Sequence, residues 1–356
     1  MANMTSHERF TRMLEHREAD RVVMWDFPWA DAQARWYNEG MPRNTDYTEY
    51  FDLDRVSRIV VDNSPRLPET IVEETDDFRV VTTKWGGTEK NFKDVMSTPD
   101  FLDFSVTEQA DWEKVKPLFT PDADRVPWAH LQKNYDAWRA GGHWIIADTD
   151  FGFEHFMSYV VGTERFLVAT LEEPEWCVDM MSTALELNLK LLDMAWEKGY
   201  TFDMLNVRDD LGYSHSQFMS SDTFREMLLP IHKRAVDWAH GKGAWARLHT
   251  CGAVKPFLSD IVDGIGYDML HPLERKAGMD PIAVKKEFGD RITIHGGIKA
   301  ALWKDWDVVK AEMDAIVPVC MEGGGYVFAA DHSIPNDVSF DAVSKVIAYA
   351  KEIGRY

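Results

Sequence analysis

Short apolar runs alternate with longer amphipathic segments along this chain, and the alternation is most regular after residue 140. The apolar runs have the length and the β-branched and aromatic content of buried strands, and each is followed by a loop and a helical pattern. The expected strands of this region are 144–149, 203–207, 244–248, 267–270, 292–295 and 326–329, and two expected helices are 174–196 and 222–241. Such alternation is typical of parallel βα units.

The first 140 residues follow a less regular pattern. Thr5 stands three residues before Glu8 and just ahead of a periodic apolar run, so we expect a capped first helix that ends near residue 17. The apolar run 22–25 predicts a short buried strand, and 59–62 is a further candidate.

These runs add up to about eight strands, the number that closes a (β/α)8 TIM barrel. We therefore expect one domain over residues 1–356. Residues 1–140 would hold the first strand or strands and an elaboration, and 141–356 the regular βα units. An open doubly wound sheet is the competing fold. It is disfavoured because no Gly-x-Gly-x-x-Gly follows an early strand.

The charge balance narrows the range of partners. Lys and Arg number 39 and Asp and Glu number 60, which gives a net charge of −21. This charge disfavours nucleic acid, anionic membranes and polyanionic substrates, although acidity also serves simply to keep a protein soluble. No apolar run has the length of a membrane span, and the polar start lacks the apolar stretch of a secretory signal, so we expect a cytoplasmic protein.

Polar residues collect where the expected strands end, and in TIM barrels the chemistry lies at the carboxyl ends of the strands. The set comprises Asp148 and Asp150; Arg208, Asp209 and Asp210; His249 and Cys251; His271 and Glu274; His295; and Asp331 and His332. Carboxylates, imidazoles and one thiol are thus expected at one mouth of the barrel.

A zinc site is the sharpest chemical prediction from this set. His249 and Cys251 are two residues apart at a strand end, and imidazole and thiolate are common zinc ligands. Glu274 and His332, at the ends of other strands, would complete four ligands. The alternative is that these are polar barrel residues satisfied by hydrogen bonds. The other two cysteines, Cys177 and Cys320, lie within helical patterns and are expected to be buried core residues.

Aromatic residues near the start suggest a binding surface. Trp25, Phe27, Trp29 and Trp36 follow the first expected strand and could form a pocket for a flat or apolar group. Core packing is the alternative explanation for a chain with 14 tryptophans.

Several stretches together resemble the uroporphyrinogen-decarboxylase-like superfamily, in particular its zinc-dependent, corrinoid-linked methyltransferases. The matching stretches are residues 5–9, 20–22, 208–212, 249–252, 271–274 and 333–335. The resemblance covers nearly the whole chain. It implies a TIM barrel with a zinc site made of His-x-Cys, a later glutamate, and a cysteine just before an Ile-Pro turn. This chain has His332 at the last position.

The imidazole at position 332 affects the reaction that the resemblance implies. Replacing a thiolate by a neutral imidazole leaves zinc more positive and hence a stronger Lewis acid. A stronger Lewis acid suits the methyl donor side, so we expect transfer from a small donor, best an O-methylated aromatic, to the Co(I) corrinoid (cobalamin) of a partner protein.

Three alternatives remain open. One is methyl transfer from a methyl-corrinoid to a thiol. Another is a metal-free uroporphyrinogen-type decarboxylase. It is disfavoured because the Arg-rich segment of that enzyme is replaced here by residues 25–29 and because the chain is strongly acidic. The third is a barrel that binds a corrinoid or small ligand without catalysis.

The remaining polar residues receive roles from their positions. Asp209 and Asp210 would orient or protonate the substrate, or serve as helix caps and ion-pair partners of Arg208. Asp331 would hold a zinc-ligating imidazole. The expected substrate-binding residues are Trp25, Phe27, Trp29, Asp148, Asp150 and Arg208.

Overall fold

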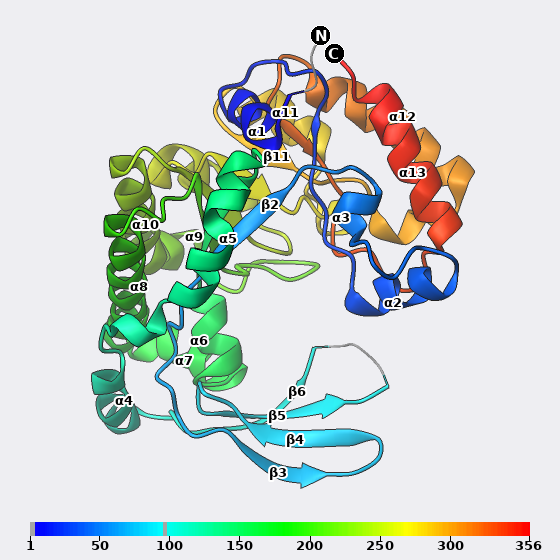
Figure 1. The fold of residues 1–356 in the computed structure, drawn as a ribbon. Coiled ribbons are helices and arrows are strands. Elements are labelled where there is room, and N and C mark those ends of the chain that lie inside the picture. Colours follow the sequence, from blue (N-terminus) through cyan, green and yellow to red (C-terminus); the bar gives the residue numbers. More distant parts are fainter. Residues whose placement is uncertain (1–3, 95–97) are drawn as a thin grey trace.

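Eight parallel strands form a curved, TIM-barrel-like sheet in the computed structural model, which describes residues 4–94 and 98–356 (Figure 1). Their order in the sheet is β1-β12-β11-β10-β9-β8-β7-β2. The strands are β1 (Val23–Met24), β2 (Val56–Val60), β7 (Trp144–Thr149), β8 (Met204–Arg208), β9 (Trp245–His249), β10 (Met269–His271), β11 (Thr293–His295) and β12 (Tyr326–Phe328). The expected barrel fold is therefore confirmed.

Helices surround the sheet on its outer side (Figure 1). They are α1 (Ser6–Leu14), α2 (Ala30–Asn38), α3 (Tyr47–Tyr50), α4 (Gln109–Val115), α5 (Trp128–Ala140), α6 (Phe153–Tyr159), α7 (Thr163–Glu172), α8 (Pro174–Glu197), α9 (Ser221–Thr223), α10 (Leu229–Gly241), α11 (Pro281–Phe288), α12 (Trp306–Met321) and α13 (Phe340–Ile353). A π-helical turn, Phe224–Leu228, joins α9 to α10. Within the described residues, no helix is both long and apolar enough to span a membrane.

The N-terminal elaboration contains a second, antiparallel sheet that the sequence pattern does not reveal. Its strands are β3 (Thr70–Glu74), β4 (Phe78–Thr82), β5 (Gly87–Phe92) and β6 (Asp100–Phe104), paired in that order. Every residue of β3 is exposed. The alternation of apolar and polar residues is weak because this sheet buries little of its surface.

Helix α1 closes the amino-terminal end of the barrel. Its start has the expected capping box, in which the Thr5 side chain accepts from the Glu8 N–H and the Glu8 carboxylate accepts from the Thr5 N–H. Phe10 and Met13 pack with Trp144, Met204 and Met269 of the strands in one apolar cluster. With this end filled by apolar side chains, polar groups inside the barrel lie toward the opposite end.

The barrel wall is interrupted between β1 and β2, which share no strand ladder in the described part of the chain. Asp54, just before β2, bridges the interruption. Its N–H donates to the Met24 carbonyl over 3.1 Å, and its Oδ2 accepts the Met24 N–H over 2.8 Å. The side chain of Asp54 therefore takes the place of a neighbouring strand at this point.

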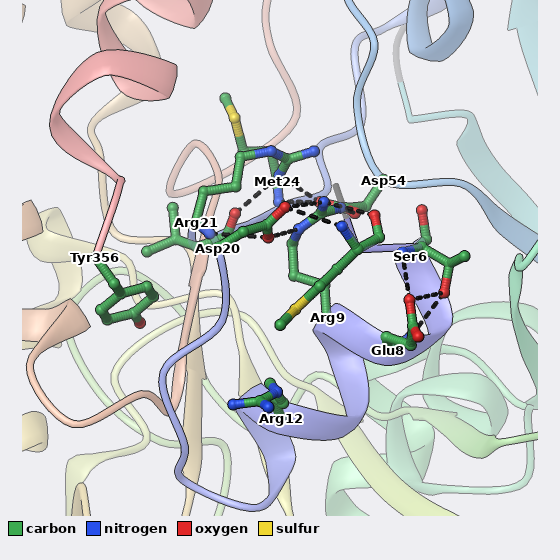
Figure 2. A network of polar contacts seen from close by, with 12 residues as sticks. Ser6, Glu8, Arg9, Arg12, Asp20, Arg21, Met24, Asp54 and Tyr356 are labelled. Atoms are coloured by element: carbon green, nitrogen blue, oxygen red, sulfur yellow. Dashed lines mark hydrogen bonds and ion pairs between the residues drawn. The ribbon is translucent and has the colours of Figure 1, made fainter. Parts of the chain in front are cut away.

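Two arginines from the start of the chain neutralise Asp54 (Figure 2). Arg21 Nη1 lies 2.7 Å from Asp54 Oδ2, and Arg9 Nη1 donates to Asp54 Oδ1. Arg9 also binds both oxygens of Asp20, at 2.7 and 2.9 Å. The first two stretches that carry the family resemblance thus tie α1 and β1 to β2.

Cys177 and Cys320 are buried with no exposed surface, as the helical pattern predicts. Trp36 is also fully buried, and its Nε1 donates to the Val338 carbonyl over 2.8 Å. The prediction that Trp36 lines a binding pocket is therefore wrong. The face of helix α2 that carries Trp36 packs against the core. The sequence could not show this contact because it depends on the tertiary fold.

Candidate functional site

Three side chains at the carboxyl ends of β8 and β9 meet at one point. The ligand atoms of Asp210, His249 and Cys251 all lie within 4.8 Å of one another. His249 Nε2 is 3.6 Å from Cys251 Sγ and 3.7 Å from Asp210 Oδ1. The structure thus brings together the His-x-Cys pair that the sequence singles out, and adds Asp210, which was expected to act on the substrate.

A glycine shapes the loop that carries Cys251. Gly252 has φ +84°, and a Cβ atom there would lie 2.3 Å from the backbone carbon of Gly212. Only glycine allows this close approach of two loops. The Gly252 N–H donates to Glu274 Oε2 over 2.7 Å, and the Cys251 N–H donates to Asp210 Oδ1 over 2.8 Å. Both carboxylates thereby hold the loop in place.

Burial keeps the ring and the thiol of this cluster uncharged. It lowers the pKa of His249 well below its usual value, and the nearby Arg247 lowers it further. Burial also raises the pKa of the Cys251 thiol, with a further contribution from the negative charges of Asp210 and Glu274. A bound cation would reverse the second effect, because it favours the thiolate.

Two further histidines follow His249 around the barrel. His249 Nδ1 and His271 Nδ1 are 2.8 Å apart, and the rings of His271 and His295 are 4.3 Å apart. His295 Nε2 donates to the Trp25 carbonyl over 2.8 Å. The sequence places both residues at strand ends but gives them no role. The sequence could have indicated a role for both residues, because each is the last residue of its strand, as His249 is.

The other two expected ligands lie outside the three-residue cluster. Glu274 is buried and binds Lys276 over 3.0 Å in addition to the Gly252 N–H. His332 stacks beside Trp29, with ring centroids 6.5 Å apart. His332 is among the residues whose electrostatic influence lowers the pKa of His249.

Asp209 is fully buried beneath the mouth. It accepts the Glu154 N–H over 2.6 Å and lies 2.9 Å from His232 Nε2. A Cβ atom at Gly152 would lie 2.2 Å from its carboxylate. These contacts favour the structural alternative for Asp209, because both of its oxygens are engaged away from the mouth.

Asp331 does not hold an imidazole, contrary to expectation. It accepts a hydrogen bond from the Ala300 N–H over 2.8 Å, and within the described ranges no histidine is bonded to it. This carboxylate therefore anchors the loop after β11 to the loop after β12. The sequence could not show this because the bond joins residues 31 positions apart.

Glu154, at the start of α6, is a titratable residue that sequence reasoning missed. Burial raises its pKa to about 8, and the negative charges of Asp210 and Asp209 add to the effect. Its carboxyl group is therefore largely protonated at neutral pH. The consecutive carboxylates Asp209 and Asp210 gave no sign of this third one, which is 55 positions away from Asp209 in sequence, in α6.

The expected substrate-binding residues divide into ion pairs and aromatic rings. Arg208 Nε lies 2.9 Å from Asp150 Oδ1. Asp148 accepts from Asn206 over 2.6 Å and lies 3.4 Å from Arg58. The rings of Trp25 and Phe27 are 5.1 Å apart, and that of Phe27 is 5.9 Å from His271.

A cavity of about 570 Å³ adjoins these rings at the interruption of the barrel wall. Trp25, Phe27 and Arg58 of β2 are among its lining residues, and the Arg58 guanidinium lies 5.6 Å from the centre of the Phe27 ring. Its volume lies in the range of small-molecule sites. Two of the aromatic residues expected at a pocket are thus found there, whereas Trp29 is not among its lining residues.

Comparison with known proteins identifies one family. The family model described as uroporphyrinogen decarboxylase (URO-D) matches residues 155–353, which is more than half of the 356-residue chain. A solved structure described as a methyltransferase from Methanosarcina mazei is 18% identical, with a TM-score of 0.66, and the match covers 98% of this chain and 99% of that one. At this identity the likeness concerns the fold.

A second solved structure is more distant. It is described as a putative vitamin-B12 independent methionine synthase from Listeria monocytogenes, and the match has 11% identity, a TM-score of 0.40, and coverage of 95% of this chain and 98% of that one. No curated protein sequence matches the chain.

Proposed function

Because this chain belongs to the uroporphyrinogen decarboxylase family, we propose that it is a zinc-dependent methyltransferase of that family. Its reaction would move a methyl group from an O-methylated aromatic donor to the Co(I) corrinoid of a partner protein. The observation that carries the proposal is the meeting of Asp210, His249 and Cys251 within 4.8 Å at the barrel mouth.

The donor set fits zinc. A thiol, an imidazole and a carboxylate are the three ligand types that zinc takes from proteins. His249 directs Nε2 toward Cys251 while its Nδ1 is bonded to His271, the arrangement that orients ligating histidines elsewhere. When bound, zinc would supply a Lewis acid that polarises the donor's ether oxygen.

Glu274 and His332 stay as candidates for completing the ligand set. Glu274 is bonded to the residue next to Cys251, so its carboxylate already lies beside the cluster. A carboxylate is also the most readily exchanged ligand, and its departure would admit the donor oxygen. The ring of His332 is stacked beside that of Trp29.

Glu154 is the residue that we propose to supply the proton. Cleavage of an aryl methyl ether leaves the electron pair of the broken C–O bond on the phenolate oxygen, which must then gain a proton. Glu154 carries a proton at neutral pH because burial raises its pKa to about 8. Asp209, expected at the sequence level for this task, would instead position Glu154 through its backbone N–H.

Metal content and methyl transfer test the proposal. Protein purified without chelators should contain about one zinc per chain, as expected for a site of this ligand set. It should also convert a reduced corrinoid to methyl-Co(III) in the presence of a guaiacol-type ether. Cys251→Ala should lose both properties, while His215→Ala, an exposed histidine near the mouth, should keep both. Failure of the parent to take up zinc on titration would refute the metal site.

A decarboxylase assay separates the two activities of the family. Uroporphyrinogen carries eight carboxylates, and the many acidic groups at this mouth oppose its binding. No coproporphyrinogen should form. Its formation at a measurable rate would overturn the methyltransferase proposal.

A further inference from the structure

We propose that a cavity at the amino-terminal end of the barrel binds the phosphate ester of a small polar molecule. The cavity has a volume of about 600 Å³, and Arg21, Arg55, Lys351 and Arg355 are among its lining residues. It lies at the end of the barrel opposite the candidate metal cluster. The inference therefore goes beyond the proposed function and does not depend on it.

The position of the cavity follows from the residues that line it. Arg21 precedes β1, Arg55 precedes β2 and Gly141 precedes β7, so the cavity lies where these strands begin. Lys351, in the last turn of α13, and Arg355, just after that helix, line the same cavity. The chemistry of TIM barrels takes place at the carboxyl ends of the strands, so a ligand bound here would occupy a separate site.

Positive charge exceeds negative charge around this cavity. Five cationic side chains line it, namely Arg9, Arg21, Arg55, Lys351 and Arg355. Asp20 and Asp52 also line it, and Asp54, which binds Arg9 and Arg21, is a third carboxylate (Figure 2). Five positive charges thus face three negative ones, although the net charge of the whole protein is −21. The local excess of two positive charges calls for an anion.

The excess charge resides on the side chains that the carboxylates leave without a close partner. Arg55 and Arg355 are exposed, and within residues 4–94 and 98–356 no ion pair or hydrogen bond is described for either side chain. Lys351 Nζ lies 3.6 Å from Asp52, whose side chain is 93% exposed, and such exposed pairs contribute little. Burial lowers the pKa of Lys351, and the charge of Arg21 lowers it further against the opposing effect of Asp52.

A phosphate group matches these donors in charge and geometry. Guanidinium groups bind phosphate oxygens through two parallel hydrogen bonds, and an ammonium group binds them as a point charge. A phosphate monoester carries a charge of about −1.5 to −2 at neutral pH, which balances the local excess. One phosphate group therefore neutralises the cavity.

The rest of the cavity suits a polar body. None of its lining residues is aromatic, and its hydroxyl groups are those of Thr5 and Ser6. Its volume lies in the range of small-molecule sites and leaves room beside a single phosphate group. A phosphorylated sugar has this combination of one charged group and a body of hydroxyl groups.

The surroundings favour a small ligand over a large polyanion. Asp52, Glu8 of α1 and Glu352, which follows Lys351, are exposed near the cavity. Nucleic acid or an anionic membrane would extend beyond the cavity and meet these carboxylates and the acidic surface of the protein. A ligand that stays within the cavity avoids this repulsion.

Calorimetry on the full chain with matched glucose derivatives tests the proposal. Glucose 6-phosphate should bind about tenfold or more tightly than glucose 6-sulfate, which has a similar shape but a smaller charge, and glucose should not bind. Each of Arg55→Gln, Lys351→Gln and Arg355→Gln should weaken binding of glucose 6-phosphate about tenfold. The ligand should also raise the Tm of the parent, because it binds the folded state.

Lys345 provides the matched control. It lies on α13 six residues before Lys351, is exposed and pairs with Asp341, and it does not line the cavity. Lys345→Gln removes the same charge from the same helix and should bind glucose 6-phosphate as the parent does. Equal weakening in Lys345→Gln and Lys351→Gln would overturn the proposal, because it would show a general effect of net charge.

The parent alone gives two further decisive outcomes. If glucose 6-phosphate does not bind at millimolar concentrations, the cavity is not a phosphate site. Orthophosphate is the second probe. Tighter binding of orthophosphate than of glucose 6-phosphate would replace the phosphate ester by free phosphate and so overturn the proposed ligand, whereas the reverse order supports it.

Discussion

His249 and His271 share one hydrogen bond between their Nδ1 atoms, 2.8 Å long, so one ring holds the other in orientation. His271→Phe removes this partner while keeping a ring of similar size in the barrel. We expect zinc affinity to fall about 10- to 100-fold, as for other residues that orient ligating histidines. Competition with a chelator measures this affinity. His271→Asn, which can still bond to His249, should recover part of it, and full affinity in His271→Phe would contradict the assignment.

His332 tests how ligand charge affects the reaction. His332→Cys should retain zinc but transfer methyl groups from ethers more slowly, because a second thiolate lowers the positive charge available to polarise the ether oxygen. His332→Ala should weaken both zinc retention and transfer. The measurements are zinc content and the rate of methyl-Co(III) formation. An ether rate in His332→Cys equal to that of the parent would refute the Lewis-acid argument, and unchanged zinc content in His332→Ala would exclude His332 as a ligand.

Gly252 allows the contact between two loops to be measured separately from backbone strain. Gly252→Ala would place a Cβ atom 2.3 Å from the Gly212 backbone, at a φ of +84°. We expect a loss of about 1 to 3 kcal/mol in the free energy of unfolding together with weaker zinc binding. Gly243→Ala is the control, because Gly243 has φ +74° but no neighbouring atom within 4 Å of its added Cβ. Equal effects of the two changes would show that strain alone is responsible.

The buried ion pair between Arg9 and Asp54 should contribute strongly to stability. Arg9 is 5% exposed and Asp54 1% exposed, so Asp54→Asn removes one of the two carboxylates that bind this buried guanidinium, together with the carboxylate that binds Arg21. We expect the free energy of unfolding to fall by about 1.5 to 3 kcal/mol, the range for hydrogen bonds to charged groups. Asp237→Asn, which breaks the exposed pair with Lys233, should cost about 0 to 1 kcal/mol in the same urea titration. A similar small cost for both would disprove the bridging role of Asp54.

Asp20 gives the same network a defined pH dependence. Burial raises its pKa, but hydrogen bonds from Arg9 and the Met4 N–H outweigh that effect and lower the pKa to about 2. Its stabilising contribution is therefore complete above its unfolded pKa, about 4, and is lost as pH falls from about 4 toward 2. The difference in unfolding free energy between the parent and Asp20→Asn should shrink over this window. A difference that stays constant from pH 7 to pH 3 would contradict it.

The sequence predicted the strands of the barrel, because the hydrophobic pattern of each strand lies within a few consecutive residues. The run 144–149 coincides with β7, and the other seven expected runs overlap the observed strands. The run 59–62 was placed too late, because Arg58 faces the cavity and interrupts the apolar pattern of β2. Local patterning cannot show which two of eight strands lack a ladder, and so the role of Asp54 was not foreseen.

The candidate site was predictable where its residues are adjacent in sequence. His249 and Cys251 meet because they flank one residue at the end of β9. Asp210 joins them through a bond to the Cys251 N–H, 41 positions away, and Glu154, at the start of α6, is influenced electrostatically by Asp210. Contacts between residues so far apart in sequence depend on how the ends of neighbouring strands are staggered. The type of each residue does not indicate this stagger.

Among the described residues, one edge of strand β2 pairs with no other strand, and such an edge is a template on which a second molecule could add its own strand. Arg58 lies in β2 and Arg55 directly precedes it, and both line the cavity beside this edge, so an added strand would have to bury or displace their charges. The open wall thus carries a risk of self-association, which the two arginines counter. A chain in which both are replaced by apolar residues should aggregate during refolding at concentrations where the parent refolds cleanly.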